Sequence, residues 1–173
     1  KHKTKPLDDE VSARQYEYLM QRLMQAGYAH YEISNFALPG FEAKHNSSYW
    51  NDSSYLGIGP SAHSYNKQTR SWNVANNALY ITQIQKNILP YEEEILSSTD
   101  KINELIMVSI RQSRGLDLSL LSAKLNQSAL NQFMNKVNKW QNQQMLFIHN
   151  DHMICLTTKG KLFADGIASD LFF

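Results

Sequence analysis

The sequence contains little cysteine and no excess of charge of either sign. Cys155 is the single cysteine among 173 residues, so the chain can neither close an internal disulfide nor hold a metal cluster that needs several thiolates. Lys and Arg number 17 against 16 Asp and Glu, so nucleic-acid binding would require a local basic patch. No apolar run reaches membrane-spanning length and no signal peptide is visible. These absences predict a soluble, cytoplasmic protein without a membrane-spanning segment or a nucleic-acid partner.

Apolar and aromatic residues are plentiful enough for a packed core. Hydrophobic residues make up 42% of the chain, with nine Tyr, seven Phe and three Trp. Residues 8–26 carry apolar side chains at three- and four-residue spacing, which predicts a helix that ends at Gly27. Tyr28–Phe36 is rich in Tyr, Ile and Phe and predicts a strand. Helix, turn and strand in this order are typical of one half of a repeating α/β unit.

The middle of the chain reads as an ordered loop followed by a helix. Residues 37–70 contain several turn-forming groups, but their many aromatic residues argue against disorder. Residues 73–89 predict a helix that Pro90 ends. Glu92–Glu94 is interpreted as a solvated linker or helix start, which places a domain boundary near residues 91–96.

The last part of the chain predicts three helices followed by a hairpin. Ser98 or Thr99, Asp117 and Ser128 are expected to cap the helices, and residues 145–148 and 153–157 to form the two strands. A final helix is expected over residues 159–171. This order of elements is that of a winged helix. The whole chain is therefore predicted to be α+β.

His45, Asn46, Tyr49 and Trp50 form the most unusual local group of side chains in the loop region. Imidazole is a good axial ligand of haem iron, and flat aromatic rings can stack on a porphyrin. One helical turn would place His45 and Tyr49 on the same face. The alternative is a structural loop in which the aromatic rings fill the core. The residues alone favour this alternative, because most single histidines are not ligands.

Gly57 and Gly59, in the segment 57–64, are the second candidates for contact with a ligand. Two glycines allow the backbone to approach a ligand closely, and exposed amides there can meet a carboxylate or a ribose. The spacing fits neither the dinucleotide nor the Walker pattern. A tight turn after a strand explains the same residues equally well.

Glu32 and Arg70 are the charged candidates. Strand alternation places Glu32 and Ser34 on one face, which can point at a ligand. The alternative is a buried Glu32–Arg70 ion pair with a purely structural role. Arg70 is the best local partner for a carboxylate because its planar fork binds both oxygens. Asn73 can cap the next helix.

The polar residues near the carboxyl end offer weaker candidates. His149, Asp151 and His152 flank the hairpin turn and are too few for a metal site. The third predicted helix carries amide side chains that can read DNA bases, but only Lys136 and Lys139 to contact phosphates. This balance favours a packing role over DNA binding.

The ordered segments of the chain resemble the radical-SAM family of oxygen-independent coproporphyrinogen III oxidases, and within it the haem-chaperone branch HemW. The resemblance covers nearly the whole chain from about residue 7. It rests on Gly27-Tyr28, Tyr31–Ala37, Pro39-Gly40, His45-Asn46-x-x-Tyr49-Trp50, Tyr55–Ser64, Arg70-x-x-Asn73, Tyr80, Ile110-Arg111-x-x-x-x-Gly115-Leu116-Asp117 and Leu156-Thr157-x-x-Gly160.

The resemblance implies a fold and a set of site residues. Residues 1–92 would be the carboxyl-terminal part of a partial (β/α) barrel with the aromatic loop region, and residues 93–173 a winged-helix-like domain. The block from His45 to Trp50 is similar to the one that marks the haem-chaperone branch. His45 would then be a candidate iron ligand. Tyr49, Trp50, Arg70, Glu32, Gly57 and Gly59 would be the other candidates for cofactor binding.

The family's three-cysteine motif is absent from this chain. The resemblance therefore implies the carboxyl-terminal portion of a parent protein, without cofactor or catalytic residues of its own and not competent alone. The parent would carry a [4Fe–4S] cluster and S-adenosylmethionine, bind haem and transfer it to an acceptor protein. The alternative is oxidative decarboxylation of coproporphyrinogen III in porphyrin biosynthesis, with Glu32 and the segment 57–64 lining the substrate or S-adenosylmethionine cavity. Whether the parent is an enzyme stays open.

Overall fold

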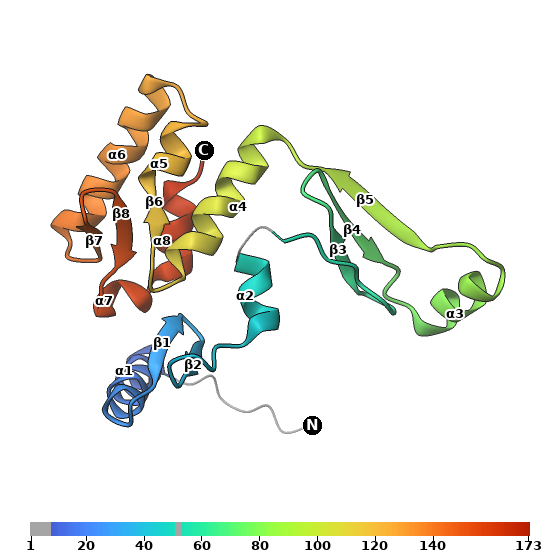
Figure 1. Ribbon diagram of the computed structural model, residues 1–173, viewed down its shortest axis with the longest axis horizontal. Helices are drawn as coiled ribbons and strands as arrows, with labels where there is room; N and C mark the ends of the chain where they lie inside the picture. Colours follow the sequence, from blue (N-terminus) through green and yellow to red (C-terminus); the bar gives the residue numbers. More distant parts are fainter. Residues whose placement is uncertain (1–7, 51–52) are drawn as a thin grey trace. The chain divides into compact units, whose positions relative to one another are not determined.

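A computed structural model describes residues 8–50 and 53–173, and it has a mixed α+β fold (Figure 1). The first seven residues of the predicted first domain lie outside the described part. Contacts divide the chain into two compact units, one made of residues 1–43 and 102–173 and the other of residues 44–101. Among the described residues, no helix is both long and apolar enough to cross a membrane.

The first unit combines a short α/β segment with a group of helices that packs against a small sheet. Its elements are α1 Asp9–Gln25, β1 Ala29–Glu32, β2 Asn35–Ala37, most of α4 Ser98–Ile110, β6 Leu116–Asp117, α5 Leu118–Ser122, α6 Gln127–Asn142, β7 Leu146–His149, β8 Met153–Leu156, α7 Thr158–Lys161 and α8 Ala164–Leu171.

The core of this unit lies among α4, α6, α8 and the sheet ordered β6-β8-β7. Its fully buried side chains include Ile106, Phe133, Ile154 and Ile167, one from each of α4, α6, β8 and α8. Burial of a large apolar side chain stabilises the fold by about 1.5–3 kcal/mol, so these elements hold one another in place.

The predicted helix over residues 8–26 is confirmed as α1. The side chain of Asp8 accepts hydrogen bonds from the amides of Glu10 and Val11, at 2.9 and 3.2 Å, and so caps its amino end. Gly27 follows with φ +85°, the left-handed conformation that ends a helix.

The single strand predicted over Tyr28–Phe36 is wrong, because this segment is a hairpin. β1 and β2 pair antiparallel, with Ala29 opposite Ala37, and the chain reverses at Ile33-Ser34. The Glu32 carboxylate accepts a hydrogen bond from the Ser34 amide at 2.9 Å and holds the turn closed. A side chain therefore makes the turn that glycine or proline makes elsewhere.

The second unit holds an antiparallel sheet where the sequence predicts an irregular loop. Its elements are α2 Lys44–Trp50, β3 His63–Tyr65, β4 Thr69–Asn73, α3 Asn77–Gln85 and β5 Tyr91–Ile95, with the sheet ordered β3-β4-β5. The prediction that residues 37–70 are loop-like is thus wrong for α2 and β3. The interpretation of Glu92–Glu94 as a linker or helix start is also wrong, because these residues form the middle of β5.

The carboxyl-terminal region contains the predicted three helices and hairpin, namely α4, α5 and α6 followed by β7 and β8. Asp117 caps α5 as expected. Asn126 rather than Ser128 caps α6, and the predicted final helix is divided into α7 and α8. The sequence places a boundary between a barrel domain and a helical domain at residues 92–93, and this boundary stays a prediction. The two compact units are divided elsewhere, at residues 43–44 and 101–102.

Candidate functional site

Helix α2 brings His45 and Tyr49 together on one face, as predicted for a helical turn. The Tyr49 hydroxyl and the His45 Nε2 atom lie 3.2 Å apart. The two rings meet edge to face with centroids 5.0 Å apart. His45 is exposed and Tyr49 retains 40% of its surface, so the imidazole is accessible from outside the unit.

Two further tyrosines extend the aromatic surface beside this pair. The rings of Tyr49 and Tyr55 lie 4.8 Å apart, and those of Tyr55 and Tyr65 lie 5.9 Å apart. A backbone bridge pairs Tyr55 with Tyr65 and fixes their positions. Trp50, half-buried, ends α2. Sequence reasoning missed Tyr55 and Tyr65 as site residues, because only the pairing of the two segments brings them to α2.

The backbone around Gly57 and Gly59 forms hydrogen bonds within the unit. The Gly57 amide donates to the Ser64 hydroxyl at 2.9 Å, and the Gly59 amide donates to the Tyr80 hydroxyl at 3.2 Å. The Asn73 side chain donates to the carbonyl oxygens of both glycines. These bonds favour the structural alternative for the two glycines. Asn73 is therefore the residue that fixes this loop, and Asn76 caps α3 in its place.

Arg70 and Glu32 have different ion partners. Arg70 lies on β4 opposite Glu94 of β5, and their charged atoms are 3.7 Å apart in a partly exposed pair. Glu32 pairs with Arg111 at 3.1 Å. The predicted Glu32–Arg70 pair is therefore wrong, since each charge is matched within its own unit.

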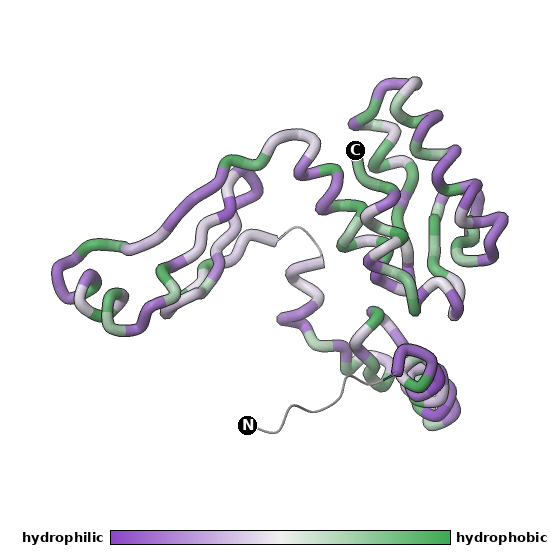
Figure 2. Tube along the Cα trace, turned by 180° about the vertical axis from the view of Figure 1, so that it is seen from behind, coloured by the Kyte–Doolittle hydropathy of each residue, from purple (hydrophilic) through white to green (hydrophobic). Residues whose placement is uncertain are grey.

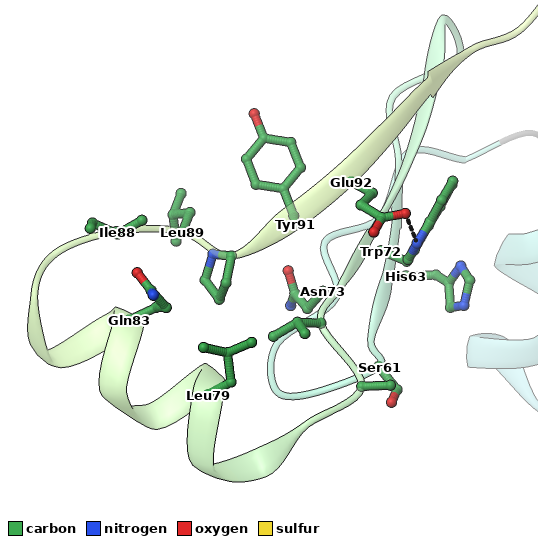
Figure 3. A pocket seen from close by; sticks show the side chains of 13 residues that line it. Ser61, His63, Trp72, Asn73, Leu79, Gln83, Ile88, Leu89, Tyr91 and Glu92 are labelled. Carbon is green, nitrogen blue, oxygen red and sulfur yellow. Dashed lines mark hydrogen bonds between the residues drawn. The ribbon is translucent and has the colours of Figure 1, made fainter.

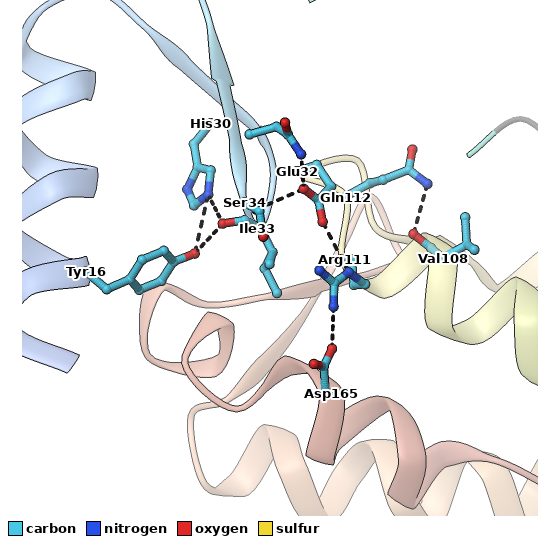
Figure 4. A network of polar contacts seen from close by, with 10 residues as sticks. Tyr16, His30, Glu32, Ile33, Ser34, Val108, Arg111, Gln112 and Asp165 are labelled. Carbon is cyan, nitrogen blue, oxygen red and sulfur yellow. Dashed lines mark hydrogen bonds and ion pairs between the residues drawn. The ribbon is translucent and has the colours of Figure 1, made fainter. Parts of the chain in front are cut away.

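The Glu32 carboxylate is the centre of a buried polar network in the first unit (Figure 4). Its residue is only 2% exposed. One oxygen accepts from the Ser34 amide and from the Asn35 side chain at 2.6 Å, and the other accepts from Arg111 Nε. Arg111 also donates to Asp165 of α8. The network links the hairpin to the end of α4 and to α8, so it favours a structural role for Glu32.

His30 forms a second buried polar group beside this network. Its Nε2 atom lies 3.0 Å from the Ile33 carbonyl oxygen, its Nδ1 atom lies 3.0 Å from Lys161 Nζ, and its ring stacks on Phe36 at 4.0 Å. A carbonyl can only accept, so we assign the proton to Nε2 and leave Nδ1 to accept from Lys161. Burial lowers the pKa of His30, and burial also lowers the pKa of Lys161.

The lowered pKa of His30 predicts that acid weakens the fold. As the pH falls below about 6.5, the histidine binds a proton in the unfolded chain before it does so in the folded one. This one histidine therefore lowers the free energy of unfolding by at most about 1.4 kcal/mol for each pH unit. The loss ends when the pH reaches the pKa that His30 has in the folded protein. Urea unfolding between neutral and mildly acidic pH will show this slope in the wild type. His30→Gln, which cannot titrate, should show a smaller slope, and an identical slope would contradict the assignment.

The remaining candidates from the sequence are Cys155 and the polar residues near the carboxyl end. Among the described residues, no group of three or more His, Cys, Asp or Glu side chains is placed to hold a metal ion. Cys155 is buried, which raises the pKa of its thiol. Both lysines of α6 contact the end of the chain, Lys136 at the Phe172 carbonyl oxygen and Lys139 at Asp170. These contacts favour the packing role for α6.

The carboxyl-terminal region matches a known family of domains. Residues 96–163 fit the model of the HemN C-terminal domain. The chain is also 35% identical over 155 residues to the heme chaperone HemW of Lactococcus lactis subsp. lactis (strain IL1403), covering 88% of this chain and 40% of that protein. HemW of Mycobacterium tuberculosis (strain ATCC 25618 / H37Rv) is 34% identical over 165 residues, covering 95% and 40%. The chain thus spans about 40% of the length of these relatives.

A solved structure supports the same fold. Coproporphyrinogen III oxidase (HemN) from Escherichia coli, described as a radical SAM enzyme, matches with a TM-score of 0.69 at 18% identity. The match covers 90% of this chain and 39% of that one. At this identity the likeness shows the fold alone.

Proposed function

We propose that this chain, which belongs to the family of the haem chaperone HemW and the coproporphyrinogen III oxidase HemN, is part of a protein that binds haem and transfers it to an acceptor protein. The relatives from Lactococcus lactis and Mycobacterium tuberculosis are described as heme chaperones, which favours haem transfer over porphyrin oxidation.

The pairing of His45 with Tyr49 on the exposed face of α2 is the observation that carries this proposal. It offers an imidazole, a good ligand for haem iron, next to the rings of Tyr49 and Tyr55, which can stack on a porphyrin. Haem iron would compete with the Tyr49 hydroxyl for the Nε2 atom of His45. Arg70 stays a prediction for contact with a propionate, and Trp50 for contact with the ring. The hydrogen bonds that Glu32, Gly57 and Gly59 form within their own units favour structural roles for these three residues.

The whole protein is proposed to carry a [4Fe–4S] cluster and S-adenosylmethionine. One buried thiol cannot hold such a cluster, so the cysteines that bind it would lie outside these residues. The cluster and S-adenosylmethionine together supply radical chemistry when bound, and no residue of this chain is assigned a part in it.

Haem titration of the full-length protein tests the role of His45. The wild type should show a Soret shift as haem binds, and His45→Ala should lose this shift or need on the order of tenfold more haem to reach it. His63→Ala is the matched control, because His63 is another exposed histidine of the same unit. Tyr49→Phe keeps the ring but removes the competing hydroxyl, so it should bind haem at least as tightly as the wild type.

Two results would contradict the proposal. Identical Soret shifts in the wild type and His45→Ala would remove His45 as the ligand. Vinyl-group products after incubation of the reconstituted full-length protein with coproporphyrinogen III, S-adenosylmethionine and a reductant would favour the oxidase alternative.

We also propose that the carboxyl-terminal region is a winged-helix-like domain. The order α4, β6, α5, α6, β7, β8 supports a winged-helix-like arrangement, with β7 and β8 as the wing. Residues 1–92 would then be the closing part of the radical-SAM barrel, and residues 93–173 the accessory domain.

A further inference from the structure

β5 is one of the two outer strands of the sheet β3-β4-β5 in the described part of the chain. All five of its residues are exposed. An outer strand presents backbone N–H and C=O groups that a strand from another chain can pair with. Figure 1 shows β5 running along one border of the second unit, with α3 at one of its ends.

The register of the sheet identifies which backbone groups of β5 point outward. The Leu96 amide donates to the Gln68 carbonyl and the Val74 amide donates to the Pro90 carbonyl, each at 2.9 Å. Hydrogen-bonded pairs alternate along an antiparallel ladder, so Glu92 and Glu94 also bond to β4. The N–H and C=O groups of Tyr91, Glu93 and Ile95 therefore point away from β4, toward the open border.

The negative charge of β5 favours a positively charged partner. Figure 2 shows a hydrophilic run between two hydrophobic segments, and this run is Glu92–Glu94. Two antiparallel copies of β5 paired through Glu93 would place glutamates opposite one another, which is destabilising. A second copy of this chain is therefore disfavoured as the occupant, and a segment carrying lysine or arginine is favoured.

An apolar cavity of about 500 Å³ adjoins the amino end of β5. Figure 3 shows Leu79 of α3, Ile88, Leu89 and Tyr91 around it. Helix α3 has no buried residue, so its apolar side chains are open to a partner. Tyr91 and Glu92 belong both to β5 and to the cavity wall, so a strand added along β5 would lead into the cavity.

We propose that β5 and this cavity together bind an extended segment of a partner protein, which adds a strand to the sheet. The segment would place an apolar side chain in the cavity and a lysine or arginine opposite Glu93. Glu93 lies on the other face of the sheet from Glu92 and Glu94, whose carboxylates contact Trp72 and Arg70 of β4. Main-chain hydrogen bonds give affinity in this mode of recognition, and pockets for alternate side chains give specificity. We identify the partner as the haem acceptor on the basis of the proposed function. The docking of an extended segment on β5 does not depend on that function.

A synthetic peptide in which leucine is followed by alternating lysine and valine is the probe, with fluorescence anisotropy on the full-length protein as the measurement. Glu93→Ala removes one charge and keeps the outward N–H group, so binding should weaken about two- to fivefold. Glu93→Pro also removes that N–H group, which an outer strand tolerates, and should weaken binding by roughly a further fivefold. Equal affinities for the two variants would overturn the strand-addition mode.

Two further measurements keep the proposal testable if Glu93→Pro unfolds. N-methylation of the peptide amides that face β5 should abolish binding, whereas N-methylation of the opposite amides should not. A peptide with glutamate in place of lysine should fail to bind, and equal binding would overturn the charge argument.

Hydrogen exchange on the free full-length protein tests whether the border is open. The amides of Tyr91, Glu93 and Ile95 should exchange fast and become protected when the peptide is added. Protection without peptide would overturn the proposal, because another part of the protein would cover β5, or a second copy if the protection depends on protein concentration. Haem titration is independent of all these readouts, so failure of the docking site and failure of haem binding are distinguishable.

Discussion

Replacement of Arg111 with alanine is expected to lower the free energy of unfolding by about 3–5 kcal/mol. The change leaves the Glu32 carboxylate without its ion partner in a site where only 1% of its side chain is exposed. It also removes the hydrogen bond that Arg111 donates to Asp165. An unpaired buried charge costs far more than the pair contributes, which is why this single change has so large an effect.

Urea denaturation followed by circular dichroism measures the loss. Arg14→Ala is the matched control, because the Arg14–Glu10 pair on α1 is also an ion pair but has 68% and 87% of its side chains exposed. Its loss should stay below about 0.5 kcal/mol. A loss of similar size for the two variants would show that Glu32 is not held by Arg111.

Replacement of Gly115 with alanine is expected to lower the free energy of unfolding by about 2–4 kcal/mol. Gly115 has φ +78°, a conformation that side chains rarely adopt. An added Cβ atom would lie 2.4 Å from the Ile154 carbonyl oxygen and 2.5 Å from the Cys155 Sγ atom. The carbonyl belongs to β8, whose pairing with β6 and β7 prevents it from moving away.

Gly166→Ala is the control for this change. Gly166 lies within α8 and an added Cβ atom would meet nothing within 4 Å. Alanine there should raise stability by up to about 1 kcal/mol, since glycine is a poor helix former. Thermal unfolding of the two variants should therefore give opposite shifts in Tm. A Gly115→Ala protein as stable as the wild type would mean that β8 can move enough to make room for the added Cβ atom.

Most helices were predictable from the sequence because their signals are local, although α2 lies in a segment that the sequence predicts as a loop. The cap at Asp8, the stop at Gly27 and the cap at Asp117 lie within a few residues of the turns that they fix. The pairing of His45 with Tyr49 is local for the same reason, because residues four apart share a helical face.

Strands and ion pairs were harder to predict because distant residues decide them. The turn at Ile33-Ser34 contains neither glycine nor proline, and the carboxylate that closes it is bound by Arg111, 79 positions along the chain. The sequence of β5 resembles a charged linker, because an outer strand needs no buried side chain and therefore shows no apolar pattern. No local pattern distinguishes Arg70 from Arg111 as the partner of Glu32.

The division of the first unit into residues 1–43 and 102–173 has a consequence for synthesis in the cell. Its amino-terminal hairpin leaves the ribosome first, but Arg111 and Lys161, which hold Glu32 and His30, emerge only after the whole second unit. Until then, the hairpin exposes a carboxylate without its arginine and a histidine Nδ1 atom without its lysine. Folding of this unit must therefore be completed late, and a nascent chain halted before residue 111 should be a preferred substrate for proteases and chaperones.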